Sequence, residues 1–108
     1  MRRGEIWLVA GGVYASKPRP AVIVQDDRFG DTDSVTVCPF TTRNLDAPLL
    51  RMAVSADNTS GISKASYLMI DKLTTVRRSN LGEQVGHLTA TQLTEFERRA
   101  LVFLGFAG

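Results

Sequence analysis

The hydrophobic pattern of this chain changes its period once, close to residue 89, and that change limits the folds open to it. Before it, apolar and β-branched residues form short runs separated by Gly, Pro, Asp and Ser, which is typical of strands joined by turns. After it, apolar residues recur at helical spacing. This order predicts a mainly β (α+β) chain, built as a strongly bent antiparallel sheet or open barrel with one terminal helix. The predicted strands are residues 5–10, 20–25, 34–40, 49–55, 65–76 and 83–88.

The final segment predicts a helix over residues 90–104, with both ends marked in the sequence. Thr89 and Gln92 have the spacing of a capping box, and Gly105 is suited to the C-terminal cap. The last nine residues, ALVFLGFAG, hold more apolar side chains than one helix face needs, which predicts self-association. The apolar face of the helix would comprise Leu93, Phe96, Ala100, Phe103 and Leu104.

Size and composition predict one domain over residues 1–108, because 108 residues with 44% hydrophobic and 22% charged side chains suffice for one core. No apolar run approaches the ~20 residues that cross a bilayer, and the first residues lack the apolar centre of a secretory signal. We therefore expect a soluble cytoplasmic protein that does not enter a membrane. Thirteen basic against eleven acidic residues give a net charge of +2, which is compatible with a polyanionic partner.

Cys38 and His87, each the only residue of its type, give no sign of a metal or cofactor site. Neither belongs to a cluster with the spacing of metal ligands, and no nucleophile motif lies near His87. The Gly11-Gly12 pair lacks the spacing of a phosphate-binding loop. We expect Cys38 to be a small buried hydrophobe, His87 to be a surface or interface residue, and the protein to need neither metal nor cofactor.

Arg19 stands between two prolines, in KPRPAVIV, at the mouth of a predicted strand. Pro18 and Pro20 restrict the backbone around it to extended conformations, so its side chain has a stiff support. A guanidinium held in this way suits a phosphate oxyanion, because its fork donates two hydrogen bonds and stays charged at physiological pH. An ordinary salt bridge at the start of a strand would explain the same residue equally well.

Thr41 and Thr42 follow the next predicted strand and are the second candidate donors. Strands 20–25 and 34–40 are joined by a short turn, so we expect them to pair. The start of one and the end of the other lie at the same end of an antiparallel hairpin, which predicts that Arg19 and Thr41 meet. A threonine hydroxyl can donate to a nonbridging phosphate oxygen. The alternative is a Thr-Thr pair that only holds a turn together.

At these positions the sequence resembles the MazF/PemK family of toxin endoribonucleases from bacterial toxin–antitoxin modules. The resemblance implies a small SH3-like, CcdB-like antiparallel β-barrel with a C-terminal α-helix, a homodimer, and cleavage of single-stranded RNA at short sequences. It spans nearly the whole chain, in the family's order. The segments that carry it are RGEIWLV at 3–9, KPRPAVIVQDD at 17–27, VTVCPFTT at 35–42, LMIDKLTTV at 68–76 and LGEQVGHLT at 81–89.

The resemblance also implies catalytic residues. The family's arginine before proline falls on Arg19, its threonine after the third strand falls on Thr41, and the acid of the PemK branch corresponds to Asp71. Asp71 is then a candidate general base, and the alternative is a strand-edge charge paired with Lys72 or with an arginine.

The chain departs from the family pattern at two places. GGVYAS, with Tyr14, stands where many members have Gly-Ser/Thr-Glu, and Met69 stands where the PemK branch has an arginine two residues before its acid. These departures leave open which groups serve as general base and acid.

For the reaction we expect metal-independent attack of the ribose 2′-hydroxyl on the adjacent phosphorus, which leaves a 2′,3′-cyclic phosphate and a 5′-hydroxyl. Basic side chains are expected to contact RNA phosphates, and aromatic ones to stack on bases. Each basic residue could instead be an ordinary solvated charge. The predicted RNA-binding residues are Tyr14, Lys17, Thr42, Arg43, Lys64, Arg77 and Arg78, with Phe40 as a further stacking candidate.

Two other classes of function remain open. One is a gyrase poison of the related CcdB fold, and the other is a non-catalytic barrel used for protein interaction; neither needs Arg19 or Thr41. For the nuclease, the expected partners are single-stranded RNA, a second copy of the chain, and a cognate antitoxin. We expect the antitoxin to be an acidic, partly disordered chain that covers the site.

Overall fold

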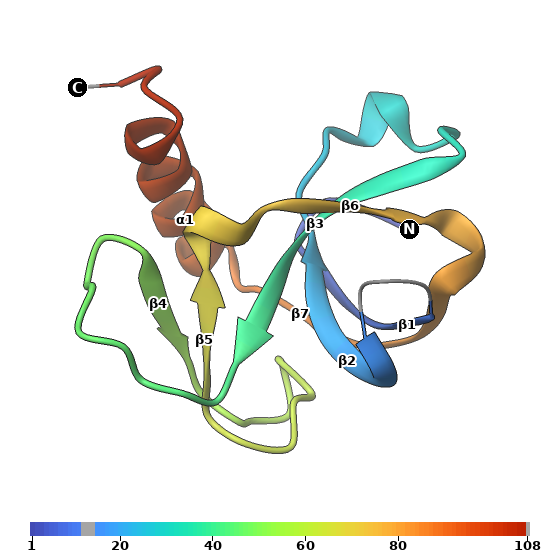
Figure 1. Cartoon of the computed structure of the whole chain (residues 1–108), viewed down its shortest axis with the longest axis horizontal. Helices are drawn as coiled ribbons and strands as arrows, with labels where there is room; N and C mark the ends of the chain where they lie inside the picture. The colour runs from blue at the N-terminus through green and yellow to red at the C-terminus, as the bar shows by residue number, and fades with distance from the viewer. Residues whose placement is uncertain (12–14, 108) are drawn as a thin grey trace.

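The computed structural model describes residues 1–11 and 15–107, and in these ranges the chain forms a seven-stranded sheet and one α-helix (Figure 1). No helix in the described ranges is long and apolar enough to cross a membrane. Three 3₁₀ turns, η1 (Asp27–Phe29), η2 (Ile70–Lys72) and η3 (Arg78–Asn80), lie between strands. The strands and the helix are β1 (Glu5–Gly11), β2 (Ala15–Ile23), β3 (Ser34–Thr41), β4 (Arg51–Val54), β5 (Ser66–Met69), β6 (Thr74–Arg77), β7 (Leu81–His87) and α1 (Ala90–Phe103).

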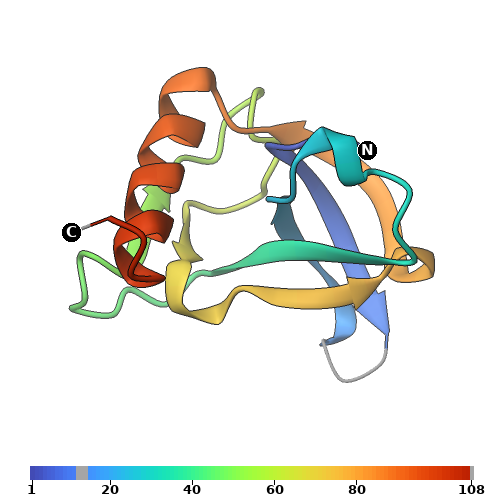
Figure 2. The same ribbon diagram turned by 90° about the horizontal axis from the view of Figure 1, so that it is seen from above.

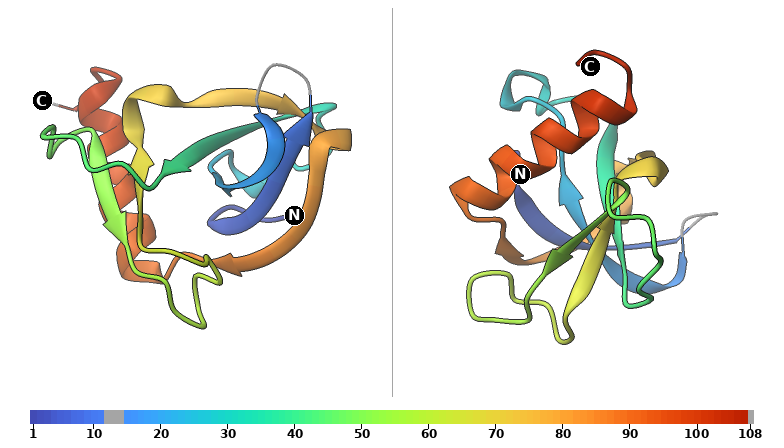
Figure 3. Two further views of the ribbon diagram at one scale, coloured as in Figure 1. Left: turned by 60° about the horizontal axis from the view of Figure 1, so that its bottom comes forward. Right: turned by 90° about the vertical axis from the view of Figure 1, so that its left-hand side faces the viewer.

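The strands pair antiparallel and form one open, strongly curled sheet in the order β4-β5-β3-β2-β1-β7, with β6 paired to the first half of β3. Helix α1 lies beside β4 and β5, while β1, β2, β3 and β6 curl around the other half of the molecule (Figure 2). Two further views show the same open curl from the side and from the helix (Figure 3). The predicted fold class, a small antiparallel β structure with a C-terminal helix, is confirmed.

The prediction of one strand over residues 65–76 is wrong, because this segment is two strands separated by turn η2. Both strands pair with β3: Phe40 lies opposite Leu68, and Val37 lies opposite Thr74. Three residues of β3 therefore span the same length as six residues of the β5–β6 segment, and turn η2 contains the extra residues. A buried apolar side chain continues through the turn, so the hydrophobic pattern conceals the interruption.

Strand β2 starts at Ala15 instead of residue 20, so Arg19 lies inside a strand, opposite Val9 of β1. The predicted loop over residues 11–18 was therefore too long. Pairing of β2 with β3 begins only at Ala21, and before it β1 is the one neighbour among the described strands. The two prolines beside Arg19 fall in this part of β2. They are tolerated there because a proline on a strand edge can turn its missing N–H toward the unpaired side.

The centre of β2 is buried on both faces, as its apolar run predicts: Ala21, Val22 and Ile23 are at most 1% exposed. Because successive side chains of a strand point to opposite faces, these residues join two cores. Val22 and Cys38 belong to the core that includes Phe96 of α1, whereas Ile23 belongs to a smaller core within the curl. The prediction that Cys38 is a buried hydrophobe is confirmed.

Helix α1 confirms the predicted helix and its capping box. The Thr89 hydroxyl accepts a hydrogen bond from the Gln92 N–H (3.1 Å), and the Gln92 side chain accepts one from the Thr89 N–H (2.8 Å). The helix ends at Phe103, one residue before the predicted end. Gly105 follows with a φ of 82°, a left-handed conformation that favours glycine at a helix end.

The loop before β5 is fastened to β7. Gly61 has a φ of 69°, and a Cβ atom there would lie 1.8 Å from the carbonyl oxygen of Val85. The His87 N–H donates to the carbonyl of Thr59 (3.0 Å). This close backbone contact fixes the start of β5, which carries Ser66.

Candidate active site

A cavity of about 300 Å³ lies where β2, β3 and β5 meet. It combines one permanent cation, three hydroxyl groups and apolar walls, which is a suitable lining for an anion with an apolar body attached. The residues that line it are Arg19, Pro20, Phe40, Thr41, Thr42, Ser66 and Met69.

Strand register explains why Arg19 and Thr41 share this cavity. Ala21 lies opposite Pro39 in the antiparallel β2–β3 pair. Arg19 lies two residues before Ala21 and Thr41 lies two residues after Pro39, so both are at the same end of this antiparallel pair, and both line the cavity. The structure thus brings together the two side chains that the sequence predicted to meet. Their role in catalysis stays a prediction.

The guanidinium of Arg19 is exposed, and within residues 1–11 and 15–107 it makes no ion pair or hydrogen bond. The salt bridge that would have given this residue a structural role is absent from those ranges. Residues 12–14 are Gly, Val and Tyr and carry no carboxylate. Among the described residues nothing occupies the Arg19 donors, which can therefore bind an anion that enters the cavity.

Thr41 holds a turn and keeps a donor at the same time. Its hydroxyl oxygen accepts a hydrogen bond from the Arg43 N–H (3.1 Å), which is the geometry of a turn stabilised by a side chain. A hydroxyl that accepts one bond can still donate another. The structural and the functional interpretations of Thr41 are therefore compatible.

The sequence predicted only some of the other residues that line the cavity. Phe40, a candidate for base stacking, is 7% exposed and belongs to the core, so its ring forms a wall of the cavity. Ser66 and Met69 were not predicted as site residues. Ser66 donates its hydroxyl hydrogen bond to the Lys64 carbonyl (2.8 Å). Both lie here because Thr41 pairs with Tyr67, and this β3–β5 register has no signal in the sequence.

Asp71 is not among the residues that line this cavity, and it is bound to Arg51. Arg51 Nη1 lies 2.5 Å from Asp71 Oδ1, and the two side chains are 7% and 25% exposed. Partial burial raises the pKa of Asp71, but the hydrogen bond and the charge of Arg51 outweigh it, so the pKa lies below its ordinary value. A carboxyl with a lowered pKa is a weaker base. The pairing agrees with the alternative of a carboxylate held by an arginine.

Neither Cys38 nor His87 lines the cavity. Burial raises the pKa of the Cys38 thiol to about 12, so almost no thiolate forms near neutral pH. His87 is exposed. In the β1–β7 strand pair it lies opposite Glu5, which is at the other end of β1 from Val9, the residue opposite Arg19. In the described part of the chain, no group of three or more His, Cys, Asp or Glu side chains is arranged to hold a metal ion.

Four of the predicted RNA-binding residues lie at the cavity end of β3. Thr42 lines the cavity, and Arg43 follows it as an exposed side chain. Lys17 is exposed on β2, two residues before Arg19, in the stretch where the β1–β2 register shifts. Lys64 is exposed and is held next to Ser66 by the hydrogen bond described above. Tyr14 falls outside the described residues.

Arg77 and Arg78 lie at the opposite end of β3. Arg77 pairs with Ser34, seven residues along β3 from Thr41, which corresponds to about 20 Å of strand. The Arg78 guanidinium donates to the carbonyls of Gly30 and Thr32, so its donors are occupied by the protein's own backbone. The structure therefore does not bring these two arginines to the cavity of Arg19 and Thr41, and their contact with RNA stays a prediction.

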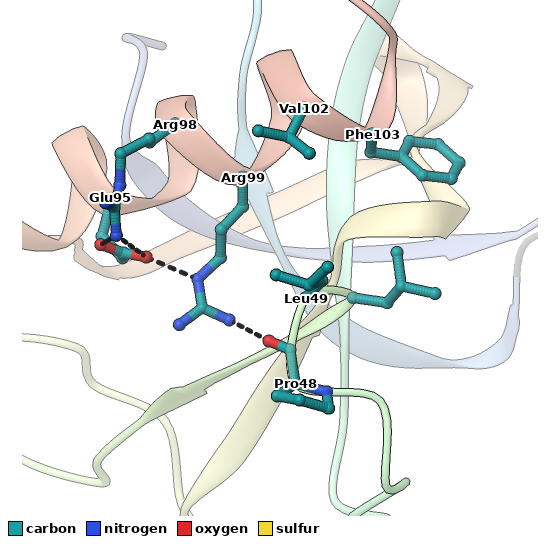
Figure 4. A pocket seen from close by; sticks show the side chains of 8 residues that line it. Pro48, Leu49, Glu95, Arg98, Arg99, Val102 and Phe103 are labelled. Atoms are coloured by element: carbon teal, nitrogen blue, oxygen red, sulfur yellow. Dashed lines mark hydrogen bonds and ion pairs between the residues drawn. The ribbon is translucent and has the colours of Figure 1, made fainter. Parts of the chain in front are cut away.

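A second concave surface, of about 540 Å³, lies beside the last turns of α1 (Figure 4). Leu49 is 69% exposed there, and Val102 and Phe103 lie over the same groove. Its two arginines both bind Glu95, so the groove presents apolar side chains and paired charges. This composition suits a protein surface better than a phosphate. The groove is lined by Pro48, Leu49, Leu50, Glu95, Arg98, Arg99, Val102 and Phe103.

Comparison with known proteins assigns a family to this arrangement. Residues 2–104 match the model of the PemK-like, MazF-like toxins of type II toxin-antitoxin systems. The chain is 54% identical, over 109 aligned positions and 100% of both chains, to the probable endoribonuclease MazF of Mycolicibacterium smegmatis.

The structure of the chain is similar to that of an endoribonuclease in complex with its cognate antitoxin from a mycobacterial species (TM-score 0.80, 20% identity, 100% and 98% of the two chains). It is also similar to MazE-MazF from Deinococcus radiodurans (TM-score 0.78, 24% identity, 97% and 96%). At these identities the two structures establish the fold alone.

Proposed function

The chain belongs to the PemK-like, MazF-like toxin family of type II toxin-antitoxin systems, and we propose that it is an endoribonuclease that cleaves single-stranded RNA at short sequences without a metal ion. The observation that carries the proposal is the exposed Arg19 in the same cavity as Thr41. The name of the mycobacterial relative, probable endoribonuclease, supports the same activity. We place its action in the cytoplasm, where its substrate is made.

In the proposed reaction the ribose 2′-oxygen attacks the adjacent phosphorus. A bond forms between the 2′-oxygen and phosphorus, and the bond between phosphorus and the 5′-oxygen of the next nucleotide breaks. The 2′-hydroxyl loses its proton and the leaving oxygen gains one, so the products are a 2′,3′-cyclic phosphate and a 5′-hydroxyl. Deoxyribose lacks the attacking oxygen, so DNA is excluded as a substrate.

Arg19 and Thr41 would stabilise the charge that grows on the nonbridging oxygens during this attack. The Arg19 fork donates two hydrogen bonds and remains charged at every physiological pH. The Thr41 hydroxyl, oriented by the Arg43 N–H, adds a third donor. The fixed positive charge of the guanidinium supplies stabilisation that a metal ion provides in other nucleases. Removing one such donor is expected to lower the rate by about 100-fold or more.

The RNA on either side of the scissile phosphate would follow the exposed cations at this end of β3. Lys17, Arg43 and Lys64 are the expected phosphate contacts, and Thr42 adds a hydroxyl within the cavity. Each single contact contributes little, and together they set a salt-dependent affinity. Tyr14 stays a predicted stacking residue.

The same proposal includes a homodimer and a cognate antitoxin. The groove beside α1 holds the exposed apolar side chains of Leu49, Val102 and Phe103, which supports a protein interface on that side of the molecule (Figure 4). The cations around the cavity suit an acidic, partly disordered antitoxin segment that would cover the site. Complexes with an antitoxin are found among the structures that share this fold.

A cleavage assay in EDTA tests the proposal with the wild type, Arg19→Ala and Arg77→Ala. Arg77 is the matched control, because within the described ranges it is also an exposed arginine without an ion pair but lies at the other end of β3. We expect the wild type and Arg77→Ala to cut a long RNA in EDTA and Arg19→Ala to be at least ~100-fold slower. The 5′ ends of the fragments should carry hydroxyls, and their sequences give the recognition site.

Two results would contradict the proposal: activity that is lost on chelation, or an Arg19→Ala variant as active as the wild type. Intact RNA in every assay, together with inhibition of gyrase, would instead identify a poison of the CcdB type.

A further inference from the structure

Arg51 is a buried arginine next to the cavity, and the proposed reaction gives it no role. It is the first residue of β4 and lies directly opposite Met69, which lines the cavity. Its Nη1 group donates to Asp71 Oδ1 (2.5 Å) and to the Leu50 carbonyl (2.9 Å). The guanidinium is thus held between β4 and turn η2, and its strand pairs with the one that carries Met69 to the cavity.

The burial of Arg51 is unfavourable in itself. Its side chain is 7% exposed, and its Nε group is buried without a hydrogen-bond partner in the described part of the chain. Removing a charge from water and leaving a donor unpaired both oppose folding, and an ion pair in such a place is weak support for stability. Its presence beside the cavity therefore favours a functional explanation.

Arg51 is also fixed from the helix side. Arg99 of α1 donates from Nη1 to the carbonyls of Arg51 (3.1 Å) and of Pro48, and its Nε binds Glu95 (2.7 Å) (Figure 4). The backbone of Arg51 is thereby fastened to α1, while its side chain is fastened to η2. The Arg51–Asp71 ion pair therefore has little freedom to separate.

The charge of Asp71 can reach the cavity. Asp71 follows Met69, which lines the cavity, by two residues, so the Cα atoms of the two are at most ~7 Å apart. This separation is shorter than the Debye length of about 8 Å at physiological ionic strength. An unpaired carboxylate there would repel an RNA phosphate held by Arg19, whereas a carboxylate paired with Arg51 has little net effect.

We propose that Arg51 is a positioning residue of the nuclease: it neutralises Asp71 and holds it in place, so that Arg19 meets the RNA phosphate without an opposing carboxylate. The inference rests on the proposed function. It makes Asp71 a counter-ion instead of the general base that the family resemblance implied.

Three variants separate the two charges. Arg51→Gln leaves an unpaired carboxylate, Asp71→Asn leaves an unpaired cation, and the double variant removes both. Affinity is measured with a pool of 2′-O-methyl RNA, which lacks the attacking hydroxyl, and cleavage rates are measured separately on ordinary RNA. We expect Arg51→Gln to bind about fivefold more weakly than the wild type, Asp71→Asn to bind more tightly, and the double variant to bind like the wild type. These differences should vanish at about 0.5 M salt.

The Asp26–Arg28 pair supplies matched controls. It is an Arg–Asp ion pair in the loop beyond the other end of β2, so Arg28→Gln and Asp26→Asn make the same changes of charge away from the cavity. Each should alter affinity by less than about twofold, because its charge is exposed and screened. If Arg51→Gln does not fold, the double variant compared with Asp71→Asn still isolates the Arg51 charge, and the double variant should bind more weakly.

The inference is overturned by either of two results. A purely structural role would make Arg51→Gln and Asp71→Asn change affinity in the same direction. A general base at Asp71 would make a folded Asp71→Asn about 100-fold slower at saturating RNA, with its affinity unchanged. A wild type that binds the RNA pool but cleaves no RNA would reject the proposed function alone, since the affinities would still decide the inference.

Discussion

Predicted functional arginines lie near both ends of strand β3, the catalytic candidate Arg19 at one end and the RNA-binding candidate Arg78 at the other, and the structure uses them differently. At one end Arg19 lines a cavity with Thr41 and has no partner among the described residues. At the other end the Arg78 guanidinium is occupied by the carbonyls of Gly30 and Thr32. The comparison of Arg19 with Arg78 shows that a surface cation is a candidate ligand-binding group only when the fold leaves its hydrogen-bond donors without internal partners.

The largest expected effect comes from removing each of these guanidinium groups. Arg19→Gln should lower the cleavage rate by about 100-fold or more and leave the melting temperature unchanged, because it removes donors that the protein does not use itself. Arg78→Gln should leave the cleavage rate unchanged and lower the melting temperature by about 10 °C. The reason is that losing hydrogen bonds from a charged donor costs roughly 2 kcal/mol of stability. Calorimetry and a cleavage assay at 25 °C measure both. Equal effects of the two variants on activity would remove the distinction between the two ends.

A smaller effect is expected at Thr41. Thr41→Val removes the hydroxyl but keeps the shape, and should slow cleavage by about 10- to 100-fold. Thr41→Ser keeps both the donor and the acceptor for the Arg43 N–H, and should stay within about threefold of the wild type. Single-turnover rates on one RNA measure the two variants. A slow Thr41→Ser would show that the methyl group, and so packing, matters more than the hydroxyl.

Much of the fold could be predicted because its signals are local. The capping box at Thr89 and the apolar run of β2 can each be recognised from a few consecutive residues, and both predictions are confirmed. The split of residues 65–76 could not be predicted, because η2 arises where two stretches of one strand meet different parts of β3. The missing information was the pairing, which involves residues about 30 positions apart.

The candidate site shows the same limit. Arg19 and Thr41 could be placed together because their strands follow each other in the chain and pair antiparallel, which brings the start of one beside the end of the other. Arg51 could not be recognised, because its partner Asp71 is reached only through the β4–β5 pairing. An arginine at the start of the apolar run LLRMAV was the one available signal, since a charge there needs a buried partner.

Acid titration compares the ion pairs Arg51–Asp71 and Arg28–Asp26. The pKa of Asp71 is lowered in the fold, so its contribution to stability is present above the unfolded pKa of about 4 and is lost as the pH falls through the folded value. Asp71→Asn should therefore lower the melting temperature at pH 7, by about 10 °C for roughly 2 kcal/mol, and this difference should shrink below pH 4. Asp26→Asn should lower it by less than about 2 °C, because that pair is exposed. A constant Asp71→Asn deficit down to pH 2 would contradict the ion-pair account.

The smallest effect compares two solvated cations, Lys17 near the cavity and Arg77 at the far end of β3. Each phosphate contact on single-stranded RNA contributes about 0.7 to the slope of log affinity against log salt. Lys17→Ala should therefore reduce that slope by about 0.7, whereas Arg77→Ala should leave it unchanged, because a cation about 20 Å from the reacting phosphate along β3 releases no counterion from the RNA held there. Titrations of 2′-O-methyl RNA at four salt concentrations measure the slopes. If Arg77→Ala reduces the slope as much as Lys17→Ala, the RNA path extends along the whole of β3, and the separation of its two ends no longer describes how the protein binds.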